Sequence, residues 1–224
     1  MRSIGILVFL VPMLSAEECK IAFATSLQRV VGPTEKEREH SIDTVVRVGC
    51  PDNQASAFVV TRESSVSAVS KSEGEKLWFV RNGAKKWNLL IDTSRLKNLS
   101  YNSKIETVEF SQHSRILYAI VGWSATEGAL MRCSVAARSC DEVDTVVHIS
   151  VLRNGFHRGR LLVVKRDASG EFVRSRYYLV APDYSSCDAY LGVSEAEAKK
   201  NLLKVNPAFA QACTGWARSR PGIL

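Results

Sequence analysis

Short segments of β-type residues dominate the sequence between Ser41 and Pro182. These segments are rich in Val, Ile, Leu, Phe, Tyr and Trp, and Gly, Asn, Asp and Ser separate them, as in antiparallel β proteins. The stretch lacks the apolar spacing of three and four residues that marks an amphipathic helix. The sequence therefore predicts a mainly β fold that consists of antiparallel meanders.

The clearest hairpin signal is the Asn-Gly pair at 82–83, which separates the strand-like segments 76–81 and 84–91. Asn-Gly accepts the positive φ angles of a two-residue hairpin turn. Counting outward from such a turn places Trp78 directly opposite Trp87. We therefore expect the two indoles on one face of the hairpin, either packed under the sheet or presented as a platform for a flat ligand such as a sugar.

Two later groups of strand-like segments have a similar spacing. Arg115-Ile-Leu and Arg160-Leu-Leu begin equivalent segments and lie 45 residues apart, within the roughly 40–50 residue repeat of propeller blades. On this spacing each group resembles a blade of a β-propeller, and 44–62 together with the Asn-Gly hairpin supplies a third group. Closed propellers usually have at least four blades. Blade-like units, an open curved sheet and a sandwich therefore remain as alternatives.

The C-terminal region has a different character from the β region. Ser194 and Glu197 have the spacing of a capping box, acidic residues open the segment and lysines follow, and Pro207 ends it. These features predict a short amphipathic helix over 194–204. The expected organisation is a leader at 1–16, an N-terminal segment at 17–40, an antiparallel β domain at 41–186, and a C-terminal helix and tail at 187–224.

The first sixteen residues have the pattern of an export signal. Arg2 precedes an apolar run from Ile4 to Leu14. The small residues Ser15 and Ala16 follow this run, and we expect cleavage after Ala16. This run is shorter than the about 20 apolar residues of a transmembrane helix. No later apolar run is long enough either, so the sequence predicts a periplasmic or secreted protein with no transmembrane segment after signal cleavage.

All six cysteines follow the expected cleavage point. In an oxidising compartment, an even number of cysteines indicates structural disulfides. A metal site would need close ligand clusters such as Cys-x-x-Cys, which the chain does not contain. We expect a bridge across a hairpin, and sequence proximity suggests two more, which gives the pairs Cys133–Cys140, Cys19–Cys50 and Cys187–Cys213.

The chain is basic, with a formal net charge of +7 that falls to +6 once Arg2 leaves with the leader. Its densest basic stretch, 153–176, alternates charged with apolar residues. Such alternation indicates either a solvated sheet face or a patch for phosphate, lipid headgroups or an acidic protein. Arg158 and Arg160 are therefore candidate binding residues. Export argues against a nucleic-acid partner.

Catalytic motifs are absent from the sequence. It has no His-Glu-x-x-His, no phosphate loop, no Gly-x-Gly-x-x-Gly and no Gly-x-Ser-x-Gly. His113 and His157 lie at equivalent points of two strand groups. They are either ordinary loop residues or part of a metal or acid–base centre, which would need an acidic partner such as Glu109 or Asp167. We predict no catalytic residue, no metal and no cofactor.

Two functions from different classes follow. The first is an exported, disulfide-stabilised binding protein, such as an inhibitor, an immunity-type protein or an envelope accessory protein, which recognises a protein partner or an anionic envelope polymer. The second is an extracellular hydrolase or metal-dependent enzyme whose site assembles only in three dimensions. The candidate binding residues are Trp78, Trp87, Trp123, Arg158, Arg160, His113 and His157.

Overall fold

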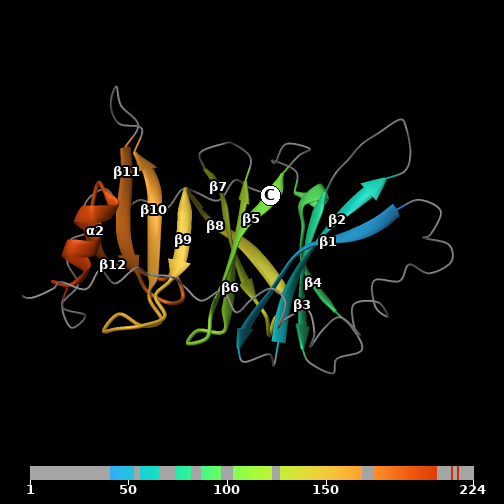
Figure 1. Cartoon of the computed structure of the whole chain (residues 1–224), viewed down its shortest axis with the longest axis horizontal. Helices are drawn as coiled ribbons and strands as arrows, with labels where there is room; N and C mark the ends of the chain where they lie inside the picture. The colour runs from blue at the N-terminus through green and yellow to red at the C-terminus, as the bar shows by residue number, and fades with distance from the viewer. Residues whose placement is uncertain are drawn as a thin grey trace, which may run out of the picture.

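The computed structural model describes residues 41–52, 56–65, 74–81, 87–96, 103–122, 127–167 and 174–205, and residues 213 and 216. The expected leader at 1–16 and the expected N-terminal segment at 17–40 lie outside these residues. In the described part, the strands form three antiparallel sheets of four strands each (Figure 1). The mainly β fold with antiparallel meanders that the sequence predicts is confirmed.

Strands that follow one another in the sequence are neighbours in each sheet. The first sheet contains β1 (Ser41–Asp52), β2 (Ser56–Ser65), β3 (Glu75–Arg81) and β4 (Asn88–Asp92). The middle sheet contains β5 (Lys104–Ser111), β6 (Ile116–Gly122), β7 (Gly128–Ser134) and β8 (Ser139–Val146). The third sheet contains β9 (His148–Val151), β10 (Leu161–Asp167), β11 (Arg174–Val180) and β12 (Cys187–Gly192).

The three sheets stand in a row, with the middle sheet between the other two (Figure 1). The arrangement follows from the middle sheet, which is buried on both faces. Along β6, Leu117, Ala119 and Val121 belong to one core cluster, whereas Tyr118 and Ile120 belong to another. Because successive side chains of a strand point to opposite faces, this continuous apolar run needs a partner sheet on each side.

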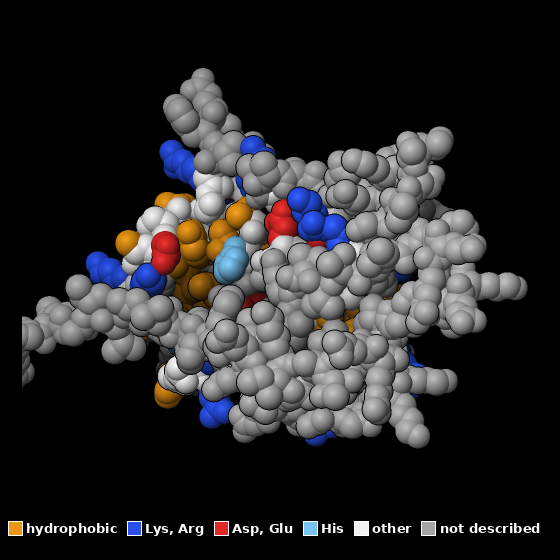
Figure 2. Space-filling view, turned by 45° about the vertical axis from the view of Figure 1, so that its right-hand side comes forward, with side chains coloured by type: hydrophobic (Ala, Val, Ile, Leu, Met, Phe, Trp, Pro, Cys, Tyr) orange, Lys and Arg blue, Asp and Glu red, His pale blue; other side chains and the backbone are white. Residues whose placement is uncertain are grey.

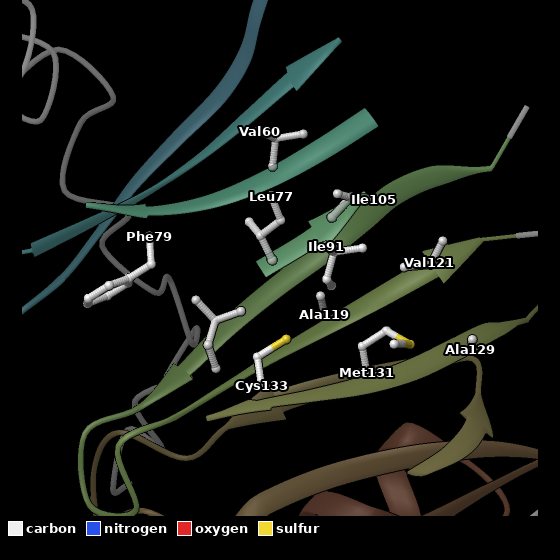
Figure 3. Close-up of a cluster of buried hydrophobic side chains, with 11 residues drawn as sticks. Val60, Leu77, Phe79, Ile91, Ile105, Ala119, Val121, Ala129, Met131 and Cys133 are labelled. Carbon is white, nitrogen blue, oxygen red and sulfur yellow. The ribbon is translucent and has the colours of Figure 1, made fainter. Parts of the chain in front are cut away.

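The first core lies between the first and middle sheets (Figure 3). Leu77 and Ile91 from the first sheet meet Ala119 and Met131 from the middle sheet. The second core lies between the middle and third sheets, where Tyr118 and Leu130 meet Ile149 and Tyr178. The stack is therefore held by two separate apolar layers.

The helix α2 (Glu195–Leu202) covers the outer face of the third sheet. Ser194 is its N-cap and accepts a hydrogen bond from the backbone N–H of Glu197 at 3.2 Å, as the capping pattern predicts. Ala198 packs with Leu179 and Leu191 in a third apolar cluster. The predicted C-terminal helix is confirmed. None of the helices in the described residues is long and apolar enough to cross a membrane.

The predicted register of the Asn-Gly hairpin is wrong. Trp78 lies opposite Leu89 rather than Trp87, and the register shifts between Leu77 and Trp78. The connection from β3 to β4 spans 82–87 instead of two residues, so outward counting from a tight turn gives the wrong partners. The two indoles still meet edge to face, with ring centroids 6.3 Å apart.

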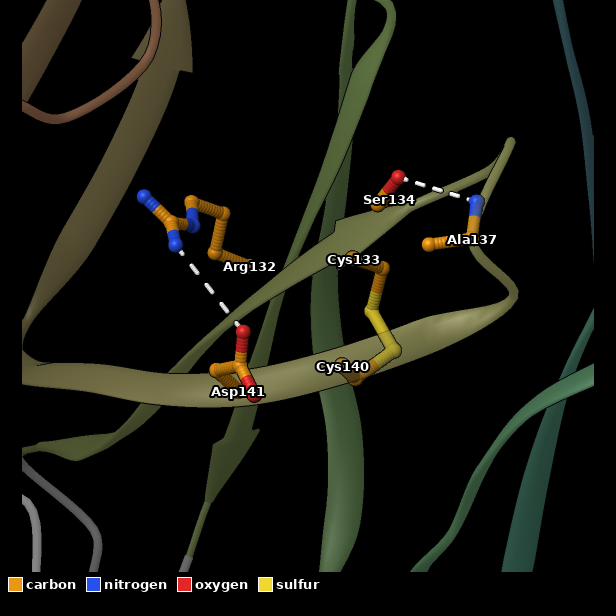
Figure 4. Close-up of a disulfide and its surroundings, with 6 residues drawn as sticks. All are labelled: Arg132, Cys133, Ser134, Ala137, Cys140 and Asp141. Atoms are coloured by element: carbon orange, nitrogen blue, oxygen red, sulfur yellow. Dashed lines mark hydrogen bonds and ion pairs between the residues drawn. A yellow bond between two sulfur atoms is a disulfide. The ribbon is translucent and has the colours of Figure 1, made fainter.

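Two disulfides lie within the described residues, and both have partners that the sequence analysis expected. Cys133–Cys140 joins β7 to β8 across a hairpin, with the Cα atoms 4.0 Å apart (Figure 4). Cys187–Cys213 ties the first residue of β12 to the C-terminal segment. The third expected bridge involves Cys19, which lies outside the described residues.

Candidate functional site

A groove of about 540 Å³ opens where the middle and third sheets meet. It lies between the β5–β6 turn and the β9–β10 loop, both at the lower end of the molecule in Figure 1. Its walls combine apolar, polar and cationic side chains with one glycine: Phe110, Gln112, His113, Val151, Leu152, Arg153, Arg158 and Gly159.

The β5–β6 turn forms one wall of the groove. Arg115 closes this turn with a φ of 55°, in the left-handed region that most side chains avoid. The Ser114 hydroxyl donates a 3.0 Å hydrogen bond to the carbonyl of Pro182, and Tyr118 donates to the same carbonyl at 2.9 Å. These bonds fix the turn of the middle sheet against the β11–β12 connection of the third sheet.

The β9–β10 loop forms the opposite wall. The N–H of Gly159 donates to the carbonyl of Leu152 at 2.7 Å, and the N–H of Leu152 donates to the carbonyl of Arg160 at 2.8 Å. Gly159 has a φ of 88°, and a Cβ at this position would lie 3.3 Å from Cβ of His113. A glycine is therefore needed here for the backbone conformation and for the close approach of the two walls.

His157 holds the loop from behind rather than lining the groove. Its side chain is buried, and its Nε2 lies 3.0 Å from the carbonyl of Leu202 at the end of α2. Because a carbonyl only accepts, Nε2 carries the hydrogen. His157 thereby anchors the loop that presents Arg158 to the helix that covers the third sheet.

The charged groups of the groove are unequally compensated. The guanidinium of Arg153 lies 3.4 Å from the carboxylate of Glu109. Burial raises the pKa of Glu109, although the charge of Arg153 and the hydrogen bonds from Arg153 and the Val151 backbone oppose this shift. Arg158 forms no ion pair with any described residue. The groove therefore presents uncompensated positive charge.

The described side chains on the face in Figure 2 have a mixed character. On the face in Figure 2, acidic side chains lie next to Lys and Arg side chains, and a histidine borders an apolar area. Such neighbouring charges of opposite sign largely cancel at a distance.

The remaining candidate binding residues lie elsewhere. Arg160 forms an ion pair with Asp188. The indole N–H of Trp78 donates to the hydroxyl of Thr61 at 2.9 Å. Trp87 lies against Trp78, and Trp123 lies outside the described residues.

The acidic residues that the sequence offered as partners for histidine are engaged by arginines. Glu109 pairs with Arg153, and Asp167 pairs with Arg176. His148 lies exposed on β9, apart from the wall that holds His113. Within the described ranges, no three His, Cys, Asp or Glu side chains are grouped in a way that suits a metal ion.

Sequence reasoning selected His113 and Arg158 and missed Phe110, Gln112 and Arg153 as groove residues. The signal for Arg153 was its place at the start of the densest basic stretch. Phe110 and Gln112 gave no such signal, because the end of a strand and a turn residue gain a ligand-facing role only when another sheet approaches them.

Comparison with known proteins adds no relative. No family model, no curated protein and no solved structure matches this chain. The functional interpretation therefore depends on the chemistry of the groove and on the scaffold that holds it.

Proposed function

We propose that this chain is an exported binding protein that recognises its partner through the groove between the β5–β6 turn and the β9–β10 loop. The observation that carries the proposal is the construction of this groove from two connections that are each fixed by hydrogen bonds. A rigid site loses little conformational entropy when a partner binds. The stack of sheets provides the scaffold, and the connections provide recognition.

Support for export comes from two features. The expected leader at 1–16 has the parts of a signal peptide, and two disulfides brace the described region. Disulfides of this kind persist in oxidising compartments and are rare in a reducing cytosol. Mass spectrometry of the protein from its own host tests this part. We expect an amino terminus at Glu17 and blocked thiols at Cys133 and Cys140, and an intact Met1 with free thiols would contradict export.

Support for binding comes from the shape and charge of the groove. Its volume of about 540 Å³ lies in the range of about 300–1,000 Å³ that is usual for ligand sites. The expected partners are a protein or an anionic polymer of the cell envelope, because the excess charge in the groove is positive.

The binding part is tested by affinity capture from the extracytoplasmic fraction of the native host. The bait is the mature oxidised protein, compared with Arg158→Glu, which reverses a charge in the groove, and with Arg174→Glu, which does the same at an exposed position at the other end of the third sheet. We expect one stoichiometric partner that Arg158→Glu loses and Arg174→Glu retains. Equal retention by both variants would contradict the groove as the binding surface.

A further inference from the structure

We infer that the groove binds an organic anion, a carboxylate or a phosphate attached to an apolar body, and that Arg158 recognises the anionic group. This inference rests on the proposed binding function and specifies the chemistry of its ligand. The argument has three steps, which concern the charge, the apolar wall and the preorganisation of Arg158.

The charge of the groove selects an anion. No carboxylate is among the described residues that line it, whereas the guanidinium groups of Arg153 and Arg158 are. The carboxylate of Glu109 pairs with Arg153. Of the two groove arginines, Arg158 is therefore the one with no ion pair to another described residue. A guanidinium presents its N–H donors in a planar fork that matches both oxygens of a carboxylate or phosphate.

The apolar wall selects the rest of the ligand. Phe110, Val151 and Leu152 line the same groove as the cations. These side chains gain free energy when they cover an apolar group, at about 25 cal/mol per Å² removed from water. A bare inorganic anion would leave this wall in contact with water, so the site suits an anion carried on an aromatic or aliphatic body.

Arg158 is placed before any ligand arrives. Its backbone N–H donates to the carbonyl of Gly155 at 3.2 Å. Of its two neighbours, His157 is held by the carbonyl of Leu202 in α2, and the N–H of Gly159 donates to the carbonyl of Leu152. Only the side chain of Arg158 remains to be ordered. Binding through this residue therefore costs less entropy than binding through an arginine on a free loop.

The experiment uses the oxidised full-length mature protein and small probes of known chemistry. Phenyl phosphate and 3-phenylpropionate carry an anion on an apolar ring, 3-phenylpropanamide is the neutral counterpart, and inorganic phosphate lacks the ring. Titrations are followed by the backbone amide signals in NMR spectra. We expect both aromatic anions to shift the signals of Gln112, His113, Arg158 and Gly159 in a saturable way, and the neutral amide and inorganic phosphate to bind at least about tenfold more weakly.

Variants assign the recognition to a residue. Arg158→Gln should weaken the aromatic anions by about 10- to 100-fold, the loss expected for a hydrogen bond to a charged group. Arg174→Gln removes the same charge far from the groove and should bind as the unmodified protein does. Glu109→Gln releases Arg153 and should tighten anion binding by about two- to fivefold. Equal thermal unfolding midpoints of the arginine variants show that the fold is intact.

Several results would overturn the inference. The neutral amide could bind as tightly as the aromatic anions, or Arg158→Gln and Arg174→Gln could lose equal amounts of anion affinity. The NMR signal shifts could also map away from the groove, or binding could fail to saturate at any soluble probe concentration. A partner captured through Arg158 without probe binding would reject the ligand class and leave the proposed function standing. Probe binding with no captured partner would support the ligand class. The relative affinities of the two aromatic anions identify the preferred acidic group.

Discussion

Asp144 is a carboxylate buried between the middle and third sheets, with 1% of its surface exposed. The ammonium of Lys165 donates to both of its oxygens, at 2.8 and 2.9 Å, and the hydroxyl of Tyr184 donates at 2.7 Å. Lys165 also lies over the ring of Trp216, with Nζ 5.0 Å from the centroid. The carboxylate tolerates burial because its charge and hydrogen-bonding capacity are satisfied by these partners.

We expect Asp144→Ala to lower the free energy of unfolding by about 3–5 kcal/mol, because it leaves the ammonium of Lys165 buried without its counter-ion. Urea denaturation followed by circular dichroism measures this loss. Asp141→Ala is the control, since Asp141 is exposed and lies 3.9 Å from Arg132, and such a pair contributes at most about 1 kcal/mol. Similar losses in the two variants would contradict the role assigned to Asp144.

Glu109 gives the fold a measurable dependence on pH. Burial raises the pKa of its carboxyl above the ordinary value of 4.5, so the folded chain holds this proton more tightly than the unfolded chain does. The contribution of Glu109 to stability therefore decreases as the pH rises from about 4.5 through the raised folded pKa.

The matched variant is Glu109→Gln, which removes the titrating group and keeps its shape. We expect the stability of the unmodified protein relative to Glu109→Gln to fall as the pH rises above the ordinary carboxyl pKa of 4.5 and through the raised folded pKa. Urea unfolding of both proteins at each pH gives this difference, in which the other titrating groups cancel. A constant difference, or one that rises with pH, would show that pairing with Arg153 outweighs burial.

At the scale of elements, the two disulfides constrain loops of different length. Cys133 and Cys140 are separated by 7 positions within one hairpin, whereas Cys187 and Cys213 are separated by 26. The second bridge holds the C-terminal segment near Trp216, whose ring lies 5.0 Å from that of Tyr178. It therefore supports packing in the second core as well as closing a longer loop.

Loop length predicts the order of their effects. Loop-closure entropy gives about 2.5 kcal/mol for the shorter loop and about 3.5 kcal/mol for the longer one. We expect the double variant Cys187→Ala with Cys213→Ala to be less stable in urea than Cys133→Ala with Cys140→Ala. The fluorescence of Trp216 should change in the former only. The reverse order of stabilities would show that native packing around Cys133, which is fully buried, dominates over loop closure.

At the scale of the whole molecule, the middle sheet determines the architecture. Both of its faces are apolar, so it joins the first and third sheets into one stack with two cores. This stacking also creates the groove, because the end of β5 and the β9–β10 loop belong to different sheets, which the second core holds together.

The sequence predicted elements well where the signal is local. The strand-like residue patterns at 104–110, 115–121, 128–135 and 139–143 correspond to β5, β6, β7 and β8, and the helix begins after Ser194, where the capping pattern places it. Strand β12 was not expected, because its short run of mixed residues between Cys187 and Gly192 becomes recognisable only by pairing with β11. The partner of Trp78 was wrong because the length of a connection depends on how both strands pack, and not only on its Asn-Gly pair.

The residues of the candidate site likewise show which features local sequence can predict and which depend on the tertiary structure. His113, His157 and Arg158 could be selected from composition and repeat position, but their roles could not be separated. Only the tertiary structure turns His157 toward Leu202 and brings Arg158 beside the wall that holds His113.

The sequence by itself determined the strands with a local signal, their meander order and the helix, because these depend on neighbouring residues, hydrogen-bonding periodicity and caps. The tertiary structure alone decided the stacking of the sheets, the counter-ion of each buried charge and the position of the groove. The physical reason is that apolar burial is non-directional. It requires that the faces of the middle sheet be covered without specifying which distant side chains then become neighbours.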